Sequence, residues 1–139
     1  MNLVSLAERV EEAGVQELLA AAVGYPSPER LARVTACYRE AGWHLLGLER
    51  GGRLVGLIGL EVQPPDRAVV QHIAVVPQER GRGIGRALLS RAAAALTVRH
   101  LTAETDTDAV GFYRRCGFAV ASLGEVYPGV ERFRCTVAL

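Results

Sequence analysis

The 139-residue sequence contains no lysine, so all 16 of its basic residues are arginine. The absence of lysine excludes a P-loop, whose GxxxxGK motif needs that residue, and leaves no lysine side chain for self-acylation. The 15 acidic residues nearly balance the arginines, so we expect neither duplex nucleic acid nor an anionic membrane surface as a partner. No apolar run reaches the roughly 18 residues of a membrane-spanning helix.

Cysteine is also scarce. The three cysteines, Cys37, Cys116 and Cys135, form no CxxC pair and lie near no histidine pair in the sequence. We therefore expect neither a disulfide framework nor a metal site, and reduced cysteines are typical of a cytoplasmic protein. Residues 1–20 lack the basic start and apolar centre of a signal peptide, which agrees with a cytoplasmic localisation.

Nothing in the sequence divides the chain into parts. It has no internal repeat, linker or low-complexity tract, and 50% of its residues are hydrophobic. A chain of this length buries about two-thirds of its unfolded surface when it folds. The sequence therefore predicts one domain over residues 1–139.

The most informative stretch lies between residues 73 and 89. A β-branched apolar run stops at Pro77, a loop of glycines and arginines follows, and a helical pattern of apolar residues begins at Ile84. Glycine lets the backbone approach a ligand closely, and the N–H groups at a helix start attract anions. Arginine side chains add forked donors that suit phosphate oxygens. The residues of this predicted phosphate-binding loop are Arg80, Gly81, Arg82, Gly83, Ile84, Gly85 and Arg86.

The loop does not match the dinucleotide fingerprint GxGxxG, because Arg86 occupies the place of the third glycine. It resembles motif A of the GNAT N-acyltransferase superfamily, Gln/Arg-x-x-Gly-x-Gly/Ala, from Arg80 to Gly85. A second GNAT signature, A-x-x-[FL]-Y-x-x-x-G-F, is matched from Ala109 to Phe118. The resemblance covers residues 43–123. The plainer alternative is a glycine-rich turn with solvated arginines.

Hydrophobic periodicity and turn residues predict the order of helices and strands. A capping-box pattern at Ser5–Glu8 predicts a first helix that ends at Gly24-Tyr25-Pro26, and Ser27-Pro28 begins a second helix that stops at Gly42. We expect strands at 43–49, 54–63, 68–76, 100–104, 118–123 and 132–138, and helices at 84–98 and between Asp106 and Gly117. This order predicts an α/β (α+β) fold whose mixed central sheet has antiparallel N-terminal strands and a parallel β-α-β core, flanked by helices.

The resemblance to GNAT enzymes implies an N-acetyltransferase that moves an acetyl group from acetyl-CoA to an amine, directly and in a ternary complex. In that family, the strand before the glycine loop splays from its neighbour, and its free backbone groups bind the pantetheine arm. Here those groups would belong to Ile73, Ala74 and Val75, with the Val75 N–H at the developing oxyanion. Tyr113 matches the tyrosine that protonates the departing thiolate. The alternative is a tyrosine of the core, because the helical face that carries it is apolar.

Two positions depart from the family pattern. Asp106 stands where many relatives carry an asparagine that binds pantetheine, and it either keeps that role as an acceptor or only caps the helix. No carboxylate lies on the strand before the loop, so the general base is assigned to His72. Strict alternation places His72 on the face of Val70 and Ala74, although a local bulge could change this. The rival bases are a water held by Gln71, Glu61 on the preceding strand and Glu104 on the following strand. The alternative for His72 itself is a hydrogen-bonded histidine of the sheet with no catalytic role.

The competing prediction is a CoA- or acyl-CoA-binding sensor or assembly module of the same fold, without catalysis. The missing strand carboxylate favours it, and the retained Tyr113 argues against it. The sequence leaves open the acceptor amine, the length of the acyl group and the oligomeric state. The apolar final strand, Phe133 to Leu139, could pair with a second copy to form a homodimer.

Overall fold

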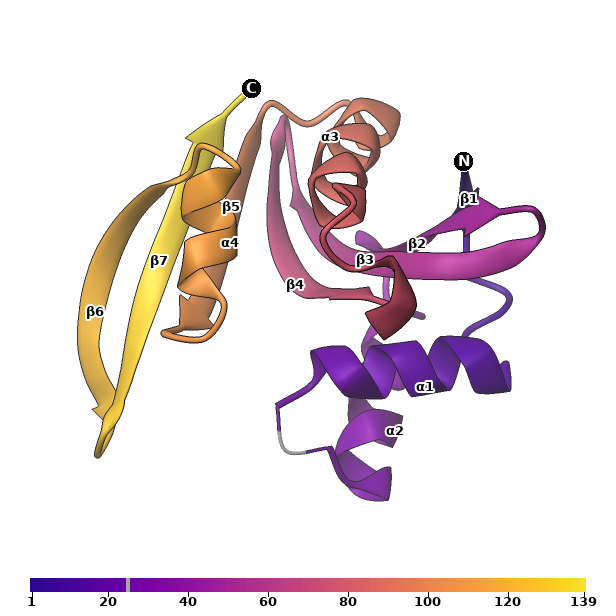
Figure 1. The fold of residues 1–139 in the computed structure, drawn as a ribbon, viewed down its shortest axis with the longest axis horizontal. Coiled ribbons are helices and arrows are strands. Elements are labelled where there is room, and N and C mark those ends of the chain that lie inside the picture. Colours follow the sequence, from indigo (N-terminus) through magenta and orange to yellow (C-terminus); the bar gives the residue numbers. More distant parts are fainter. Residues whose placement is uncertain (25) are drawn as a thin grey trace.

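The computed structural model describes residues 1–24 and 26–139 and contains one seven-stranded sheet in the order β1-β2-β3-β4-β5-β7-β6 (Figure 1). Its strands are β1 (Asn2–Ser5), β2 (Trp43–Arg50), β3 (Arg53–Gln63), β4 (Arg67–Val75), β5 (His100–Asp106), β6 (Ala119–Tyr127) and β7 (Val130–Ala138). The helices are α1 (Ala13–Ala22), α2 (Pro28–Cys37), α3 (Ile84–Leu96) and α4 (Val110–Arg115), with a short 3-10 turn, η1, at Pro77–Glu79.

The strand pairing confirms the predicted fold class. Strands β1 to β4 pair in antiparallel fashion, β4 and β5 are parallel across α3, and β5, β7 and β6 are antiparallel again. The expected pairing of the final strand with a second copy is restricted. Strand β7 pairs with β5 on one side and, from Val130 to Thr136, with β6 on the other, so residues 133–136 have no free edge on which a second copy could extend the sheet. The outer edge at this end is β6.

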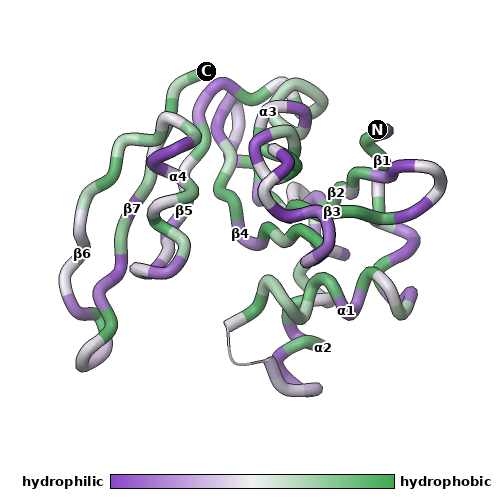
Figure 2. Tube along the Cα trace, in the orientation of Figure 1, coloured by the Kyte–Doolittle hydropathy of each residue, from purple (hydrophilic) through white to green (hydrophobic). Residues whose placement is uncertain are grey.

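The core lies on both faces of the sheet. Helices α3 and α4 cover one face, where Leu88 and Tyr113 pack on strand residues such as Ile58. Helices α1 and α2 cover the other face, where Leu19 packs near Leu57. Figure 1 shows α1 and α2 on the side of β3 away from α3, and Figure 2 shows the apolar stretches of β3 and α1 in green. In the described part of the chain, no helix combines the length and the apolar character that crossing a membrane requires.

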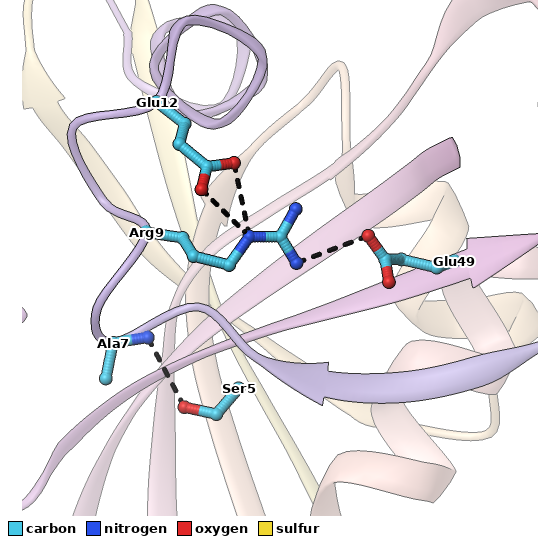
Figure 3. Close-up of polar contacts among 5 residues, drawn as sticks. All are labelled: Ser5, Ala7, Arg9, Glu12 and Glu49. Carbon is cyan, nitrogen blue, oxygen red and sulfur yellow. Dashed lines mark hydrogen bonds and ion pairs between the residues drawn. The ribbon is translucent and has the colours of Figure 1, made fainter. Parts of the chain in front are cut away.

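The predicted first helix begins too early. Residues Asn2–Ser5 form β1 along the open edge of β2, and α1 begins only at Ala13. Between them, Ser5 Oγ accepts a hydrogen bond from the Ala7 N–H at 3.3 Å. The Arg9 guanidinium then joins the turn to the sheet, because it contacts Glu12 at 3.1 Å and Glu49 of β2 at 3.2 Å (Figure 3). Pairing with a distant strand therefore outweighs the local capping signal.

The start of the second helix is as predicted, but its end is not. Ser27 caps α2 by accepting a hydrogen bond from the Arg30 N–H at 3.1 Å, and proline occupies the first turn. The helix ends at Cys37, and Tyr38 is its C-cap, several residues before Gly42. The predicted role of Tyr25 at the end of the first helix lies outside the described residues.

Candidate functional site

The parallel pair at the centre of the sheet opens toward the glycine loop. Strands β4 and β5 pair only from Arg67–His100 to Val70–Ala103. Beyond that point β4 continues to Val75 and β5 to Asp106, without further pairing between them. Figure 1 shows the two strands diverging toward the start of α3. The splay that the family resemblance implied is therefore present in the sheet.

The open side of β4 carries backbone groups. The Val76 N–H donates to the Val55 carbonyl of β3 at 2.9 Å. Because the groups of an antiparallel strand alternate in direction, the backbone of Ala74 faces β3, while that of Ile73 and Val75 faces the opening. The Arg80 Nε, which lies 3.4 Å from the Val75 carbonyl oxygen, agrees with this direction. Two of the three backbone positions proposed for pantetheine therefore point into the opening.

The glycine loop presents a row of unsatisfied donors. Among the described residues, the N–H groups from Gly81 to Arg86 donate to no protein acceptor, and the first bond of α3 runs from the Ala87 N–H to the Gly83 carbonyl at 3.0 Å. Gly81 and Gly83 have φ angles of +77° and +78°, which side chains rarely allow. The loop therefore has the free N–H groups that an anion at a helix start needs.

Two of the loop arginines also contact other groups of the protein. Arg82 contacts the Glu79 carboxylate at 3.3 Å, and Glu79 also pairs with Arg50 at 2.9 Å. Arg86 donates to the backbone carbonyl of Arg115 at the end of α4. Arg82 and Arg86 belong to the same loop as the free N–H groups and carry positive charge, which the Glu79 carboxylate offsets at Arg82. The three arginines are nevertheless exposed to solvent, so what distinguishes this loop from a plain glycine-rich turn is its row of free N–H groups.

The third glycine of the motif has a packing role that its spacing did not reveal. A Cβ added at Gly85 would lie 2.8 Å from Cε1 of Phe112, so the missing side chain leaves room for that ring. Together with the Arg86–Arg115 bond, this contact holds α4 against the start of α3. The two GNAT-like signatures therefore touch each other in space.

Tyr113 lies in the α3–α4 core, only 4% exposed, with the Phe112 and Phe118 rings edge-on at 5.1 Å. Burial, with a smaller contribution from Cys135 and Cys116, raises the pKa of its phenol, which stays protonated at neutral pH. Among the described residues its hydroxyl has no hydrogen-bond partner, yet no buried side-chain oxygen or nitrogen is left unpaired. The hydroxyl therefore keeps some contact with solvent.

Asp106 is not the N-cap of α4, which is Ala109 and has no side-chain cap, so this one of its two predicted roles is wrong. Its Oδ1 accepts hydrogen bonds from the N–H groups of Asp108 at 3.0 Å and Ala109 at 3.3 Å. These bonds close the turn between β5 and α4. Its role toward pantetheine stays a prediction.

A bulge in β4 changes the face on which His72 lies. His72 pairs with Gly59 and Val70 with Leu60, which leaves Gln71 as an extra residue. Val70 therefore packs in the α3–α4 core, while Ala74 packs on the α1–α2 side. Strict alternation, which put His72 on the face of both Val70 and Ala74, fails here: the bulge considered as the alternative separates His72 from Val70 and leaves it on the face of Ala74.

His72 contacts a residue that the sequence did not connect with the site. The Tyr38 hydroxyl lies 2.5 Å from His72 Nδ1. Burial, assisted by the positive charge of Arg30, lowers the pKa of His72 to about 4. No sequence signal joins these residues, because Tyr38 and His72 are 34 positions apart and meet only when α2 packs on the sheet.

The rival bases lie on the same face as His72. Glu61 accepts a hydrogen bond from the Gln71 side-chain amide at 3.3 Å, and Glu104 forms an ion pair with Arg134 at 3.2 Å. The neighbouring residues Leu60 and Ala103 pack on the α3–α4 side, so alternation directs both carboxylates to the opposite face. The structure thus brings the three candidate bases to the α1–α2 face.

Comparison with known proteins adds independent evidence. A sequence model described as the Acetyltransferase (GNAT) family matches residues 11–118. The N-alpha-acetyltransferase RimI of Mycobacterium tuberculosis is 39% identical over 90 residues, which are 60% of this chain and 57% of that protein. The match thus spans just over half the length of this curated relative.

Solved structures show the same fold. The ribosomal-protein-S18-alanine N-acetyltransferase of Escherichia coli superimposes with a TM-score of 0.77 at 22% identity, over 99% of this chain and 92% of that one. The aminoglycoside 6'-N-acetyltransferase of Enterococcus faecium superimposes with a TM-score of 0.78 at 15% identity, over 99% of this chain and 97% of that one. The family resemblance and the fold predicted from sequence are both confirmed.

Proposed function

Because the chain belongs to the GNAT acetyltransferase family, we propose that it transfers an acetyl group from acetyl-CoA to an amine, as one domain over residues 1–139. The observation that carries this proposal is the row of free N–H groups from Gly81 to Arg86 beside the opening between β4 and β5. The row suits a pyrophosphate, and the opening suits an extended arm with its own amide groups. Binding both substrates together makes the transfer effectively unimolecular.

The donor would lie along the open side of β4. Its phosphates would accept hydrogen bonds from the loop, and its pantetheine amides would pair with the backbone of Ile73 and Val75. That arrangement brings the thioester carbonyl near Val75, whose N–H would stabilise the oxyanion as it forms. Asp106 at the end of β5 would lie across the same opening.

The proposed reaction conserves every proton. The ammonium acceptor first loses one proton to a base, and its nitrogen lone pair then attacks the thioester carbon. The resulting C–N bond forms as the C–S bond breaks, and the sulfur takes the phenolic proton of Tyr113. The nitrogen and the base each release one proton to solvent, and solvent returns one proton to Tyr113. The products are an acetylated amine, free CoA thiol and one proton.

The base is proposed from the α1–α2 face. His72, the candidate from sequence, could act only with its proton on Nδ1, which would then donate to Tyr38. Its lowered pKa makes it a weak proton acceptor at neutral pH. The carboxylates of Glu61 and Glu104 also carry the negative charge that attracts an ammonium group. We therefore favour one of these two carboxylates.

The first acceptor to test is the amino terminus of a peptide. The curated relative with 39% identity is named as an N-alpha-acetyltransferase, and one of the structural neighbours is named as a ribosomal-protein-S18-alanine N-acetyltransferase. Other neighbours are named for aminoglycosides and spermidine, so these amines form the comparison set.

Turnover of acetyl-CoA with such a panel tests the proposal. We expect release of one CoA thiol for each acetylated amine, with mass spectrometry locating the acetyl group on nitrogen. Tight CoA binding without thiol release from any amine would overturn catalysis and favour the non-catalytic CoA-binding module instead. Failure to bind CoA at all would overturn both.

A further inference from the structure

The Tyr38 ring packs against the sheet at Gly59 of β3, where the missing side chain leaves space for it. A Cβ added at Gly59 would lie 1.7 Å from the Tyr38 hydroxyl oxygen, so only glycine leaves room for this ring. The Trp43 ring packs edge-on at 5.5 Å, and the tyrosine is 4% exposed. Its hydroxyl meets His72 Nδ1 at 2.5 Å. The ring is therefore fixed by β2, β3 and β4 at once.

The contact also depends on the bulge. The extra residue Gln71 turns His72 toward α2, whereas uninterrupted alternation from Val70 would turn it toward α3. Among the described residues His72 Nε2 has no hydrogen-bond partner, and no buried side-chain nitrogen is left unpaired. Nε2 therefore reaches solvent, on the face that carries Glu61 and Glu104.

Hydrogen-bond accounting selects one tautomer of His72. Both rings are neutral at pH 7, because burial raises the pKa of Tyr38 and lowers that of His72. If His72 Nδ1 carried the proton, it would donate to the Tyr38 oxygen, and the phenolic hydrogen of Tyr38 would have no acceptor among the described residues. Leaving a buried donor without an acceptor costs free energy. If Tyr38 donates to Nδ1, both groups are satisfied and the imidazole proton resides on Nε2.

We propose that Tyr38 is a positioning residue that holds His72 as a neutral imidazole with its proton on Nε2, so that His72 donates a hydrogen bond to an oxygen of the acceptor substrate, such as a peptide carbonyl, and does not serve as the base for its amine. The role in transfer rests on the proposed function; the tautomer does not. The positive charge of Arg30 on α2 disfavours a positive charge on His72 and supports the same neutral form.

The tautomer is measured without any substrate. Two-bond ¹H–¹⁵N correlation spectra distinguish the Nε2–H from the Nδ1–H imidazole, and loss of signals in His72→Gln assigns the residue. We expect His72 to be in the Nε2–H form at neutral pH. In Tyr38→Phe, which keeps the ring over Gly59, both tautomers should appear. An Nδ1–H form in the wild type, or an unchanged spectrum in Tyr38→Phe, would overturn the proposal. Tyr127→Phe removes an exposed hydroxyl and is the matched control.

Kinetics then separate a donor from a base. The amide of glutamine donates from near the Nε2 position but cannot take up a proton at neutral pH. We expect His72→Gln to retain the acceptor KM within about threefold, His72→Leu to raise it roughly tenfold, and the KM for acetyl-CoA to stay unchanged. Equal and complete loss of kcat in both variants, with CoA binding intact, would make His72 the base and overturn the proposal. If the wild type acetylates no amine, the proposed function fails, while the spectra still decide the tautomer.

Discussion

The two sides of the proposed site are built from different materials. The donor side consists of main-chain N–H groups from Gly81 to Arg86 and along Ile73 and Val75, and neighbouring segments of the chain supply them. The acceptor side consists of side chains from several elements, among them Tyr38 after α2 and His72 on β4. Main-chain donors bind whatever phosphate or amide is presented to them, whereas a set of side chains can distinguish one amine from another. The donor side therefore indicates the cosubstrate, acetyl-CoA, and the acceptor side is expected to determine which amine is acetylated.

The largest effect is expected on the donor side, from Gly83→Val. The φ of +78° is strained for a β-branched residue, by about 1–2 kcal/mol or more, and relief of the strain would move the N–H groups away from the phosphates. We expect acetyl-CoA affinity by calorimetry to fall at least roughly a hundredfold, the loss of about 2.7 kcal/mol or more of binding free energy. Gly129→Val, at a φ of +77° in the β6–β7 turn, imposes the same strain away from the site and should leave the affinity unchanged. Equal affinities in both variants would refute the anion-binding role of the loop.

Tyr113→Phe tests the group proposed to protonate the thiolate. Phenylalanine fills the same space among Phe112 and Phe118 but has no proton for the departing thiolate. We expect kcat to fall about a hundredfold, the usual size of general acid catalysis, while the affinity for acetyl-CoA is kept. Steady-state turnover and CoA titration measure the two quantities separately. An undiminished kcat would assign Tyr113 to packing alone.

Gly85→Ala tests the contact that joins the two signatures. Alanine inside a helix normally stabilises it by up to about 1 kcal/mol over glycine. Here the added methyl group would lie 2.8 Å from the Phe112 ring, so we expect the free energy of unfolding to fall by about 1–3 kcal/mol in urea denaturation. Gly111→Ala in α4 meets only the flexible end of Arg115, at 3.3 Å, and should not destabilise the protein. A gain in stability from Gly85→Ala would show that the packing is not tight.

The smallest effect is expected on the acceptor side, from the titration of His72. Its pKa is lowered from 6.5 to about 4 in the folded chain, so the unfolded chain binds more protons between these values. The free energy of unfolding should therefore fall as the pH drops through this window. Allowing for partial exposure, we expect a loss of about 1–2 kcal/mol that is missing in His72→Gln. Urea denaturation at pH 7 and pH 4.5 measures the difference, and parallel profiles would contradict it.

Local signals explain which features could be predicted from sequence. A proline after an apolar strand, glycines in the loop and a serine cap before Pro28 each act within a few residues, because backbone conformation and helix-end N–H groups are local properties. The loop at 80–86, the start of α2 and the strand-helix-strand order were predicted for this reason. The two signatures then indicated the family without any knowledge of their contact through Gly85 and Phe112.

Only the tertiary structure decided the features that depend on distant partners. Residues Asn2–Ser5 form a strand because β2 offers them an open edge, although Ser5 begins a helix-capping pattern. The bulge at Gln71 appears only in the pairing of β4 with β3, and it alone determines the face of His72. Tyr38 reaches His72 because Gly59, in a third segment, leaves space for its ring. The sequence by itself thus determined the loop proposed to bind CoA, whose conformation is local, while the arrangement of side chains around the acceptor arises only when separate segments pack together.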